Sequence, residues 1–161
     1  MTKIKFGTVW VLISMLSAFA NACELRFDSG ERDLLDGPEL LQPDYWRAYA
    51  GGGVRLAECD LPMWRGEAPF GHTTPGPYFT FTVEELEGFT LQIRTVSNCD
   101  TTLLVNGASE EWYFNDDDGE GTGPLVNINP ADNGRYDVWL GTVGEQDGLC
   151  ESMVVLETFM L

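Results

Sequence analysis

The chain has 161 residues, of which 26 are acidic and 9 are basic, and its formal net charge is −17 at pH 7. Such an excess of carboxylates repels nucleic acid and anionic membrane surfaces, and this excludes both as partners. It favours divalent cations and basic proteins, and it also suits simple solubility in a salty exterior.

Residues 1–22 have the three parts of a secretory signal peptide. Two lysines precede an apolar run at residues 9–19, which is followed by an A-x-A cleavage site at residues 20–22. The apolar run is shorter than the roughly 20 residues that a membrane anchor needs. A lipoprotein signal is the alternative because Cys23 follows the cleavage site, but Ala20 fits the lipoprotein motif poorly. The sequence therefore predicts a cleaved signal peptide and a periplasmic or secreted protein.

Cleavage removes 22 of the 161 residues and leaves 139, the size of one ordinary domain. Both lysines leave with the signal, so seven arginines face 26 acids and the net charge becomes 7 − 26 = −19. The remaining chain divides into an acidic, irregular N-terminal segment at 23–50 and a β-domain at 51–161. The first segment has no clear period, and the three glycines at 51–53 end it.

Apolar and polar residues alternate after residue 50 with the period of two that is typical of strands. In YFTFTV, for example, Phe79, Phe81 and Val83 share one face while two threonines share the other. Seven segments of this kind are separated by turn sequences: 78–83, 89–96, 101–105, 111–115, 125–129, 135–142 and 152–159. Short strands at this spacing indicate an all-β sandwich or barrel.

Three short motifs resemble the bacterial pre-peptidase C-terminal (PPC) domain. They are Asp100-Thr101 in one strand, Asn115-Asp116-Asp117 in a loop and Gly134-Arg135-Tyr136-Asp137-Val138 in a later strand. The resemblance identifies 51–161 as a PPC-like domain, similar to small exported, stand-alone proteobacterial proteins. It implies an antiparallel, jelly-roll-like β-sandwich of about seven to nine strands. Some members of the family bind calcium.

Four cysteines follow the signal peptide: Cys23, Cys59, Cys99 and Cys150. An even number in an exported chain predicts two disulfides, and the lack of a C-x-x-C spacing argues against a zinc or redox site. The count alone leaves three pairings open. The topology implied by the PPC resemblance brings the regions of Cys99 and Cys150 together, which favours that bridge and leaves Cys23–Cys59 as the other.

The acidic run NDDDGEG at residues 115–121 predicts a calcium site in a sandwich loop. Calcium takes six to eight hard oxygen ligands, and the glycines allow the backbone to fold around an ion. An EF-hand is excluded, because its twelfth position is Asn127 here and Pro124 interrupts the loop. The candidate ligands, with Asp100 added from the family topology, are Asp100, Asn115, Asp116, Asp117, Asp118 and Glu120. A solvated acidic turn is the alternative, and magnesium is the weaker choice of ion.

The sequence offers little for catalysis. Its one histidine, His72, lies in a Pro/Gly-rich stretch, and the chain has no G-x-S-x-G nucleophile turn. The cysteines are expected to be oxidised, which leaves a hydrolase using acidic residues as the enzyme alternative. We therefore expect a non-catalytic binding or recognition module, with a periplasmic or extracellular protein or a glycan as its partner.

Three tryptophans are candidates for stacking on a sugar ring: Trp46, Trp64 and Trp139. Trp46 and Trp64 lie in loop-like stretches, and Trp139 alternates away from the core positions of its strand. Exposed tryptophans beside acids would suit a carbohydrate- or matrix-binding module. Packing of residues 23–50 over the sandwich would use the same tryptophans, and it is the preferred interpretation. A cell-surface or matrix structural subunit is a separate alternative, which shares the sandwich and differs in self-association.

Overall fold

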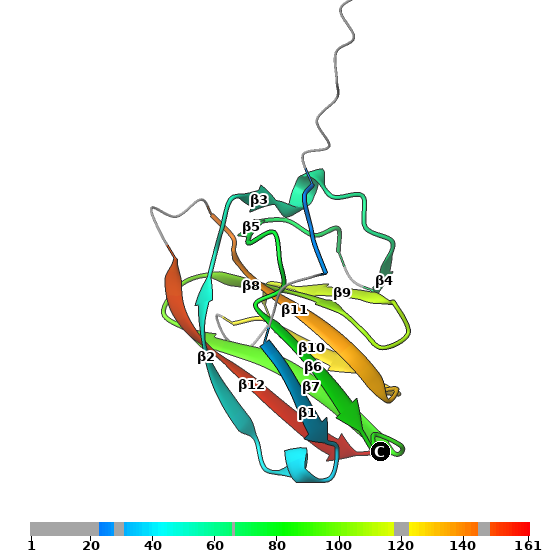
Figure 1. The fold of residues 1–161 in the computed structure, drawn as a ribbon. Helices are drawn as coiled ribbons and strands as arrows, with labels where there is room; N and C mark the ends of the chain where they lie inside the picture. The colour runs from blue at the N-terminus through cyan, green and yellow to red at the C-terminus, as the bar shows by residue number, and fades with distance from the viewer. Residues whose placement is uncertain (1–22, 28–30, 66, 118–122, 145–148) are drawn as a thin grey trace, which may run out of the picture.

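The protein folds as two β-sheets that pack face to face (Figure 1). The computed structural model describes residues 23–27, 31–65, 67–117, 123–144 and 149–161. Within these ranges the regular structure is almost entirely strand, and the two helical elements are short 3-10 turns at Glu39–Leu41 (η1) and Leu56–Glu58 (η2). The all-β sandwich that the period-two segments and the family resemblance indicate is therefore confirmed.

The smaller sheet has four antiparallel strands in the order β10-β7-β12-β2. These strands are β2 (Asp44–Ala50), β7 (Phe89–Ser97), β10 (Leu125–Ile128) and β12 (Cys150–Met160). The long strand β12 lies in the middle and forms extended ladders with β7 on one side and β2 on the other. Strands β2 and β10 are therefore the edges of this sheet.

The larger sheet has the strand order β1-β6-β11-β8-β9-β4, and β5 joins it by pairing with β11 and with β3. Its strands are β1 (Glu31–Asp36), β3 (Val54–Arg55), β4 (Met63–Arg65), β5 (His72–Thr73), β6 (Phe79–Glu84), β8 (Thr101–Asn106), β9 (Trp112–Asn115) and β11 (Gly134–Thr142). The central pairs are antiparallel. The edge strands β1 and β4 instead run parallel to their neighbours β6 and β9.

Alternating residues of both sheets build the core between them. Phe79 and Phe81 of β6 are buried, as their spacing in the sequence predicts, and they belong to one cluster with Ile93 and Leu156 of the smaller sheet. Phe81 stacks on Tyr136 of β11 with ring centroids 5.6 Å apart. Burial of each such side chain contributes about 1.5–3 kcal/mol, so this layer supplies much of the stability of the fold.

The outer face of the larger sheet is buried as well, beneath a third layer of mostly irregular chain. Trp139 and Trp112 lie in a second apolar cluster, which is covered by side chains from residues 23–27 and 54–63. Residues 136–142 of β11 are consequently all buried, whichever face of the sheet they point to. The outward alternation of Trp139 is correct, but the third layer covers its side chain.

Two disulfides join distant parts of the chain. Cys23 is bonded to Cys59 with a Cα–Cα distance of 4.9 Å, and Cys99 is bonded to Cys150 with a Cα–Cα distance of 6.4 Å. The pairing that the PPC resemblance favours is therefore confirmed. Because the Cys23 sulfur is engaged in a disulfide, it cannot carry the thioether-linked lipid of a lipoprotein. Two disulfides are typical of a protein that folds in an oxidising compartment.

The N-terminal segment at 23–50 is not irregular throughout, contrary to its sequence pattern. It contributes one edge strand to each sheet, β1 and β2, with η1 between them. Strand β2 is hard to recognise because its two fully buried residues, Ala48 and Ala50, are small, and only Trp46 on the same face is a large core contact. Its exposed face carries two tyrosines and an arginine. With the short strands β3, β4 and β5, the described residues form twelve strands rather than seven to nine.

Some sequence predictions fall on residues outside the described ranges. These are the signal peptide at 1–22 and the proposed calcium ligands Asp118 and Glu120. Within the described residues, no helix has the length and apolar character needed to cross a bilayer.

Candidate functional site

The acidic loop begins where β9 ends. Asn115 is the last residue of β9, and its side-chain oxygen accepts a hydrogen bond from the Leu125 N–H at 2.8 Å. This bond joins the end of β9 to the start of β10 across the loop. Asp100 directly precedes β8, and Leu103 of β8 pairs with Asn115, so Asp100 lies at the same end of the ladder as the acidic run.

The described part of this loop does not by itself form a metal centre. Asp116 is half-buried, whereas Asp117 and Asp100 are exposed. Among the described residues, no three His, Cys, Asp or Glu side chains gather at a position that could hold a metal ion. Because the Asn115 oxygen accepts the Leu125 N–H, it is a weaker candidate ligand than the carboxylates are. Calcium binding therefore stays a prediction.

The Pro/Gly-rich neighbourhood of His72 suggests a loop, but the residue lies on the short strand β5. It pairs with Thr142 of β11, and its Nδ1 atom is buried without a hydrogen-bond partner among the described residues. A catalytic histidine needs a group that orients its ring and a nucleophile within hydrogen-bond reach. No group among the described residues orients the His72 ring by a hydrogen bond to Nδ1.

The three candidate tryptophans have different environments. The Trp46 ring packs on Phe79, with centroids 4.8 Å apart, and its Nε1 donates to Asp44 Oδ2 at 2.9 Å. Trp139 is fully buried, so it cannot stack on a ligand from solution. Trp64 on β4 is 56% exposed. Of the three tryptophans, Trp139 is thus excluded as a ligand-stacking residue, Trp46 is held in internal packing, and Trp64 alone is exposed.

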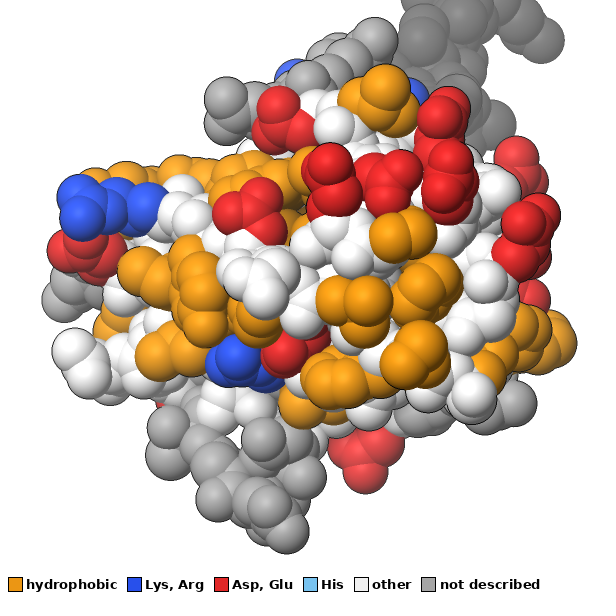
Figure 2. Space-filling model, turned by 90° about the horizontal axis from the view of Figure 1, so that it is seen from below, with side chains coloured by type: hydrophobic (Ala, Val, Ile, Leu, Met, Phe, Trp, Pro, Cys, Tyr) orange, Lys and Arg blue, Asp and Glu red, His pale blue; other side chains and the backbone are white. Residues whose placement is uncertain are grey.

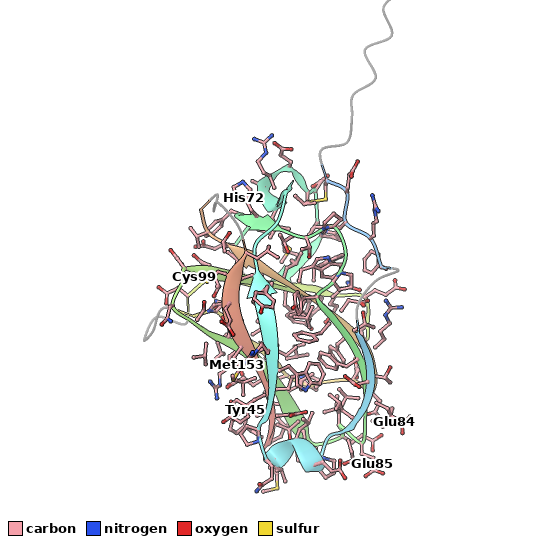
Figure 3. The ribbon with its side chains drawn as sticks, turned by 60° about the vertical axis from the view of Figure 1, so that its left-hand side comes forward. Tyr45, His72, Glu84, Glu85, Cys99 and Met153 are labelled. Carbon is pink, nitrogen blue, oxygen red and sulfur yellow. A yellow bond between two sulfur atoms is a disulfide. The ribbon has the colours of Figure 1, made fainter. Side chains whose placement is uncertain are left out.

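An aromatic and apolar surface occupies the outer face of the smaller sheet. Four large side chains there are each between 38% and 56% exposed, and we call them the tyrosine face: Tyr45, Tyr49, Val96 and Met153. Figure 3 shows Tyr45 and Met153 along the neighbouring strands β2 and β12 of this sheet. None of the four residues is singled out by the sequence patterns above. The alternation of DYWRAYA places the two tyrosines on one face of β2, but only the register of three strands joins them to Val96 and Met153.

Strand register makes the tyrosine face continuous. Met153 pairs with Arg47 of β2 and with Val96 of β7, so these three residues form one row across three strands. Tyr45 and Tyr49 flank Arg47 on the same face of β2, and they pair with Val155 and Glu151 of β12. An exposed ion pair joins Arg47 Nε to Glu151 Oε1 at 3.5 Å. The charges within this surface therefore compensate each other.

Acidic side chains gather at one end of the sandwich. Figure 3 places Glu84 and Glu85 at the end where β6 finishes, close to η1. Figure 2 views this end of the molecule and shows acidic side chains along one side of it, beside hydrophobic ones. This negative charge is exposed to solvent, where it acts at long range on charged partners.

Fold and surface together define the class of this protein as a disulfide-bonded, acidic β-sandwich with an exposed aromatic face. No family model matches the chain, and no curated protein matches it. Among solved structures it is similar to the crystal structure of Aeromonas hydrophila PliG, a periplasmic lysozyme inhibitor of g-type lysozyme. The two share 10% sequence identity with a TM-score of 0.44, over 81% of this chain and 100% of that chain. This likeness is too weak to transfer a function.

Proposed function

We propose that this protein is an exported, non-catalytic binding module that recognises a basic protein through the tyrosine face. The observation that carries the proposal is the continuous exposure of two tyrosines, a valine and a methionine on one sheet. Contiguous apolar patches on soluble proteins mark interaction sites, and tyrosine, methionine and arginine are enriched in protein interfaces. Burial of such anchors supplies most of the free energy of binding.

The charge of the chain supports a basic partner. A net charge of −17, or −19 after cleavage of the signal, attracts cationic proteins over long distances and accelerates their encounter. At the contact itself the Arg47–Glu151 pair leaves the tyrosine face close to neutral. A second copy of this chain carries the same large negative net charge, so long-range repulsion between the two molecules disfavours self-association.

Two observations support export as part of the proposal. The disulfides Cys23–Cys59 and Cys99–Cys150 persist in an oxidising compartment. The sequence at 1–22 has the pattern of a cleaved secretory signal. We therefore assign the protein to the periplasm or to the extracellular medium.

The non-catalytic part of the proposal is supported by the position of His72. The buried Nδ1 atom of this one histidine has no partner among the described residues, and all four cysteines are in disulfides. The disulfide-bonded cysteines are not available as nucleophiles, and no group among the described residues orients the His72 ring through Nδ1.

We also propose that the domain is PPC-like and binds calcium structurally at the acidic loop. The family motifs lie at matching ends of strands: Asp100-Thr101 at the start of β8 and Asn115-Asp116-Asp117 at the end of β9. Asp100 and the acidic run that follows β9 lie at the same end of the β8–β9 ladder, where a bound cation would reduce the repulsion between their carboxylates. Calcium is the ion whose preference for several hard oxygens suits this composition.

Affinity capture from the exported fraction of the source cells tests the proposed function. The double variant Tyr45→Ser, Met153→Ser removes two anchors of the tyrosine face. Leu34→Ser is the matched control, because Leu34 is 70% exposed but lies on β1 of the other sheet. We expect the wild type and the control to retain the same basic protein, and the double variant to lose it.

Identical capture by all three proteins would contradict the proposal, as would a retained partner that is acidic. The interaction is also expected to weaken as salt rises, because the Debye length falls from about 10 Å at 0.1 M to about 3 Å at 1 M. Hydrolysis of a peptide, ester or glycan by the wild type that disappears in His72→Ala would contradict the non-catalytic part.

A further inference from the structure

A groove of about 610 Å³ lies on the outer face of the larger sheet, beside the third layer. Its size is within the range of small-molecule binding sites, about 300–1,000 Å³. The residues of this groove that matter for binding are Phe27, Asn106, Glu110, Trp112, Arg135 and Asp137. The groove belongs to the opposite sheet from the tyrosine face, so an inference from it is independent of the proposed function.

The floor of the groove is a fixed ion pair. Asp137 is only 3% exposed, and its Oδ1 accepts hydrogen bonds from Arg135 Nη2 at 2.8 Å and from Thr80 Oγ1 at 2.6 Å. The same Nη2 atom donates to the backbone oxygen of Phe27 at 2.7 Å. Arg135 thus has one nitrogen anchored, while its side chain stays 43% exposed and can donate further hydrogen bonds to a ligand. The pair carries no net charge.

An aromatic wall stands beside this floor. Phe27 is 45% exposed, yet its ring is held edge-on against Trp112 and Trp139, with centroids 5.8 Å and 5.5 Å away. Two ring contacts and the Arg135 hydrogen bond to its backbone fix the position of Phe27. A held aromatic ring presents an apolar surface to a ligand without a large cost in side-chain entropy.

Glu110 occupies an unusual backbone position at the groove. It lies in the β8–β9 turn with φ at 62°, in the left-handed region, where its N–H donates to the Gly107 oxygen at 2.9 Å. Glycine or asparagine is the ordinary residue for that conformation, and another side chain there is disfavoured. The sequence nevertheless places a carboxylate here, exposed and lining the groove.

We propose that this groove binds a neutral oligosaccharide. Sugar hydroxyls donate and accept hydrogen bonds at once, and the groove offers both kinds of partner: Arg135 donates, Glu110 accepts, and the Asn106 amide does both. Phe27 supplies the apolar surface for the C–H face of a sugar ring. Glu110 and the net charge of the chain oppose an anionic ligand, and the Arg135 guanidinium, which Asp137 already neutralises, is left to donate hydrogen bonds to a neutral one.

Calorimetric titration of the full chain with three neutral trisaccharides tests this proposal: cellotriose, maltotriose and tri-N-acetylchitotriose. We expect at least one of them to bind, with an affinity that changes less than about twofold between 50 and 500 mM NaCl, because a neutral ligand is not subject to screening. Glu110→Gly is expected to weaken binding by about tenfold or more, because a hydrogen bond to a charged acceptor is lost. Its melting temperature should stay unchanged or rise, since glycine relieves the left-handed backbone.

Glu85→Gly is the matched control. Glu85 is also a glutamate with a left-handed backbone, at φ 56°, and it lies in the turn after β6 outside the groove. This variant should bind the trisaccharide as the wild type does. Failure of all three sugars at millimolar concentration would overturn the proposal. Equal affinities of Glu110→Gly and Glu85→Gly for the trisaccharide would also overturn it. So would a groove that binds acetyl-arginine amide in a salt-sensitive way and binds no sugar.

Discussion

Trp139 and Trp64 are the same residue type in opposite environments. Trp139 is fully buried, and its Nε1 donates to the Pro75 oxygen at 3.3 Å, whereas Trp64 is 56% exposed. Replacement of Trp139 by alanine leaves a large cavity and is expected to cost about 3–5 kcal/mol in the free energy of unfolding. Trp64→Ala is expected to change it by less than about 0.5 kcal/mol. Urea unfolding measures both, and similar midpoints for the two variants would mean that the third layer does not pack as described.

Tyr136 links stability to alkaline pH. Burial raises its pKa well above the ordinary value of 10.0, the Asp132 carboxylate adds to the rise, and its hydroxyl donates to the Asp132 backbone oxygen at 2.5 Å. Burial likewise raises the pKa of Tyr113, with help from Glu111. Above pH 10 the unfolded chain releases these protons first, so it binds fewer protons than the native state and stability falls as pH rises.

The wild type is therefore expected to lose stability above pH 10 at up to about 1.4 kcal/mol per pH unit for each of the two tyrosines. Tyr136→Phe removes one of these groups, and its loss of stability with pH should be about half as steep. Tyr49→Phe, on the exposed tyrosine face, is the control and should follow the wild type. Unfolding in urea between pH 8 and pH 11 measures the slopes. Equal slopes for Tyr136→Phe and the wild type would contradict this assignment.

Comparison of the expected and observed strands shows which parts of the fold can be predicted from the sequence. All seven period-two segments are strands, and the bounds agree within about two residues, because each buries a face, either between the two sheets or, for β9, beneath the third layer. Strand β2 is missed because alanines occupy its buried face and tyrosines its exposed one. Strand β1 is missed because Leu34 and Leu35 are adjacent, on opposite faces of a parallel edge strand.

The candidate sites were predictable to different degrees. Four cysteines in an exported chain predict two disulfides from sequence alone, and only the topology selects their pairing. The groove depends on Phe27, Glu110 and Arg135, which are distant in the sequence and meet through tertiary packing. The tyrosine face depends on the register of three strands. No local pattern contains that information, so neither surface could be recognised before the fold was known.

The Cys23–Cys59 disulfide fastens the third layer, and with it one wall of the groove. It closes a sequence separation of 36 residues, for which chain entropy gives a stabilisation of about 4 kcal/mol. The double variant Cys23→Ala, Cys59→Ala should unfold at lower urea and should also bind the trisaccharide more weakly, because Phe27 lies only four residues from the lost bridge. Removal of Cys99–Cys150 should lower stability without changing sugar affinity. A Cys23/Cys59 variant with both properties unchanged would contradict this role.

The large negative charge of the whole molecule leads to the prediction that calcium stabilises it. An ion that binds only the native state stabilises it by about 2.7 kcal/mol at a hundredfold excess over its Kd. This is expected to raise the melting temperature by about 5–10 °C, and a chelator should reverse the rise. Magnesium should substitute poorly. The gain should shrink in Asp116→Asn with Asp118→Asn. If calcium shifts the variant and the wild type equally, the ion only screens the acidic surface.

Recognition of a basic protein through the tyrosine face is tested most directly by one affinity measurement. The partner captured by the wild type is purified and titrated against the wild type, Leu34→Ser and the double variant Tyr45→Ser, Met153→Ser. Interface anchors of this kind each contribute about 2 kcal/mol or more, so the double variant should bind at least about a hundredfold more weakly. Leu34→Ser should bind as tightly as the wild type does. An equal Kd for all three proteins would contradict recognition through this face.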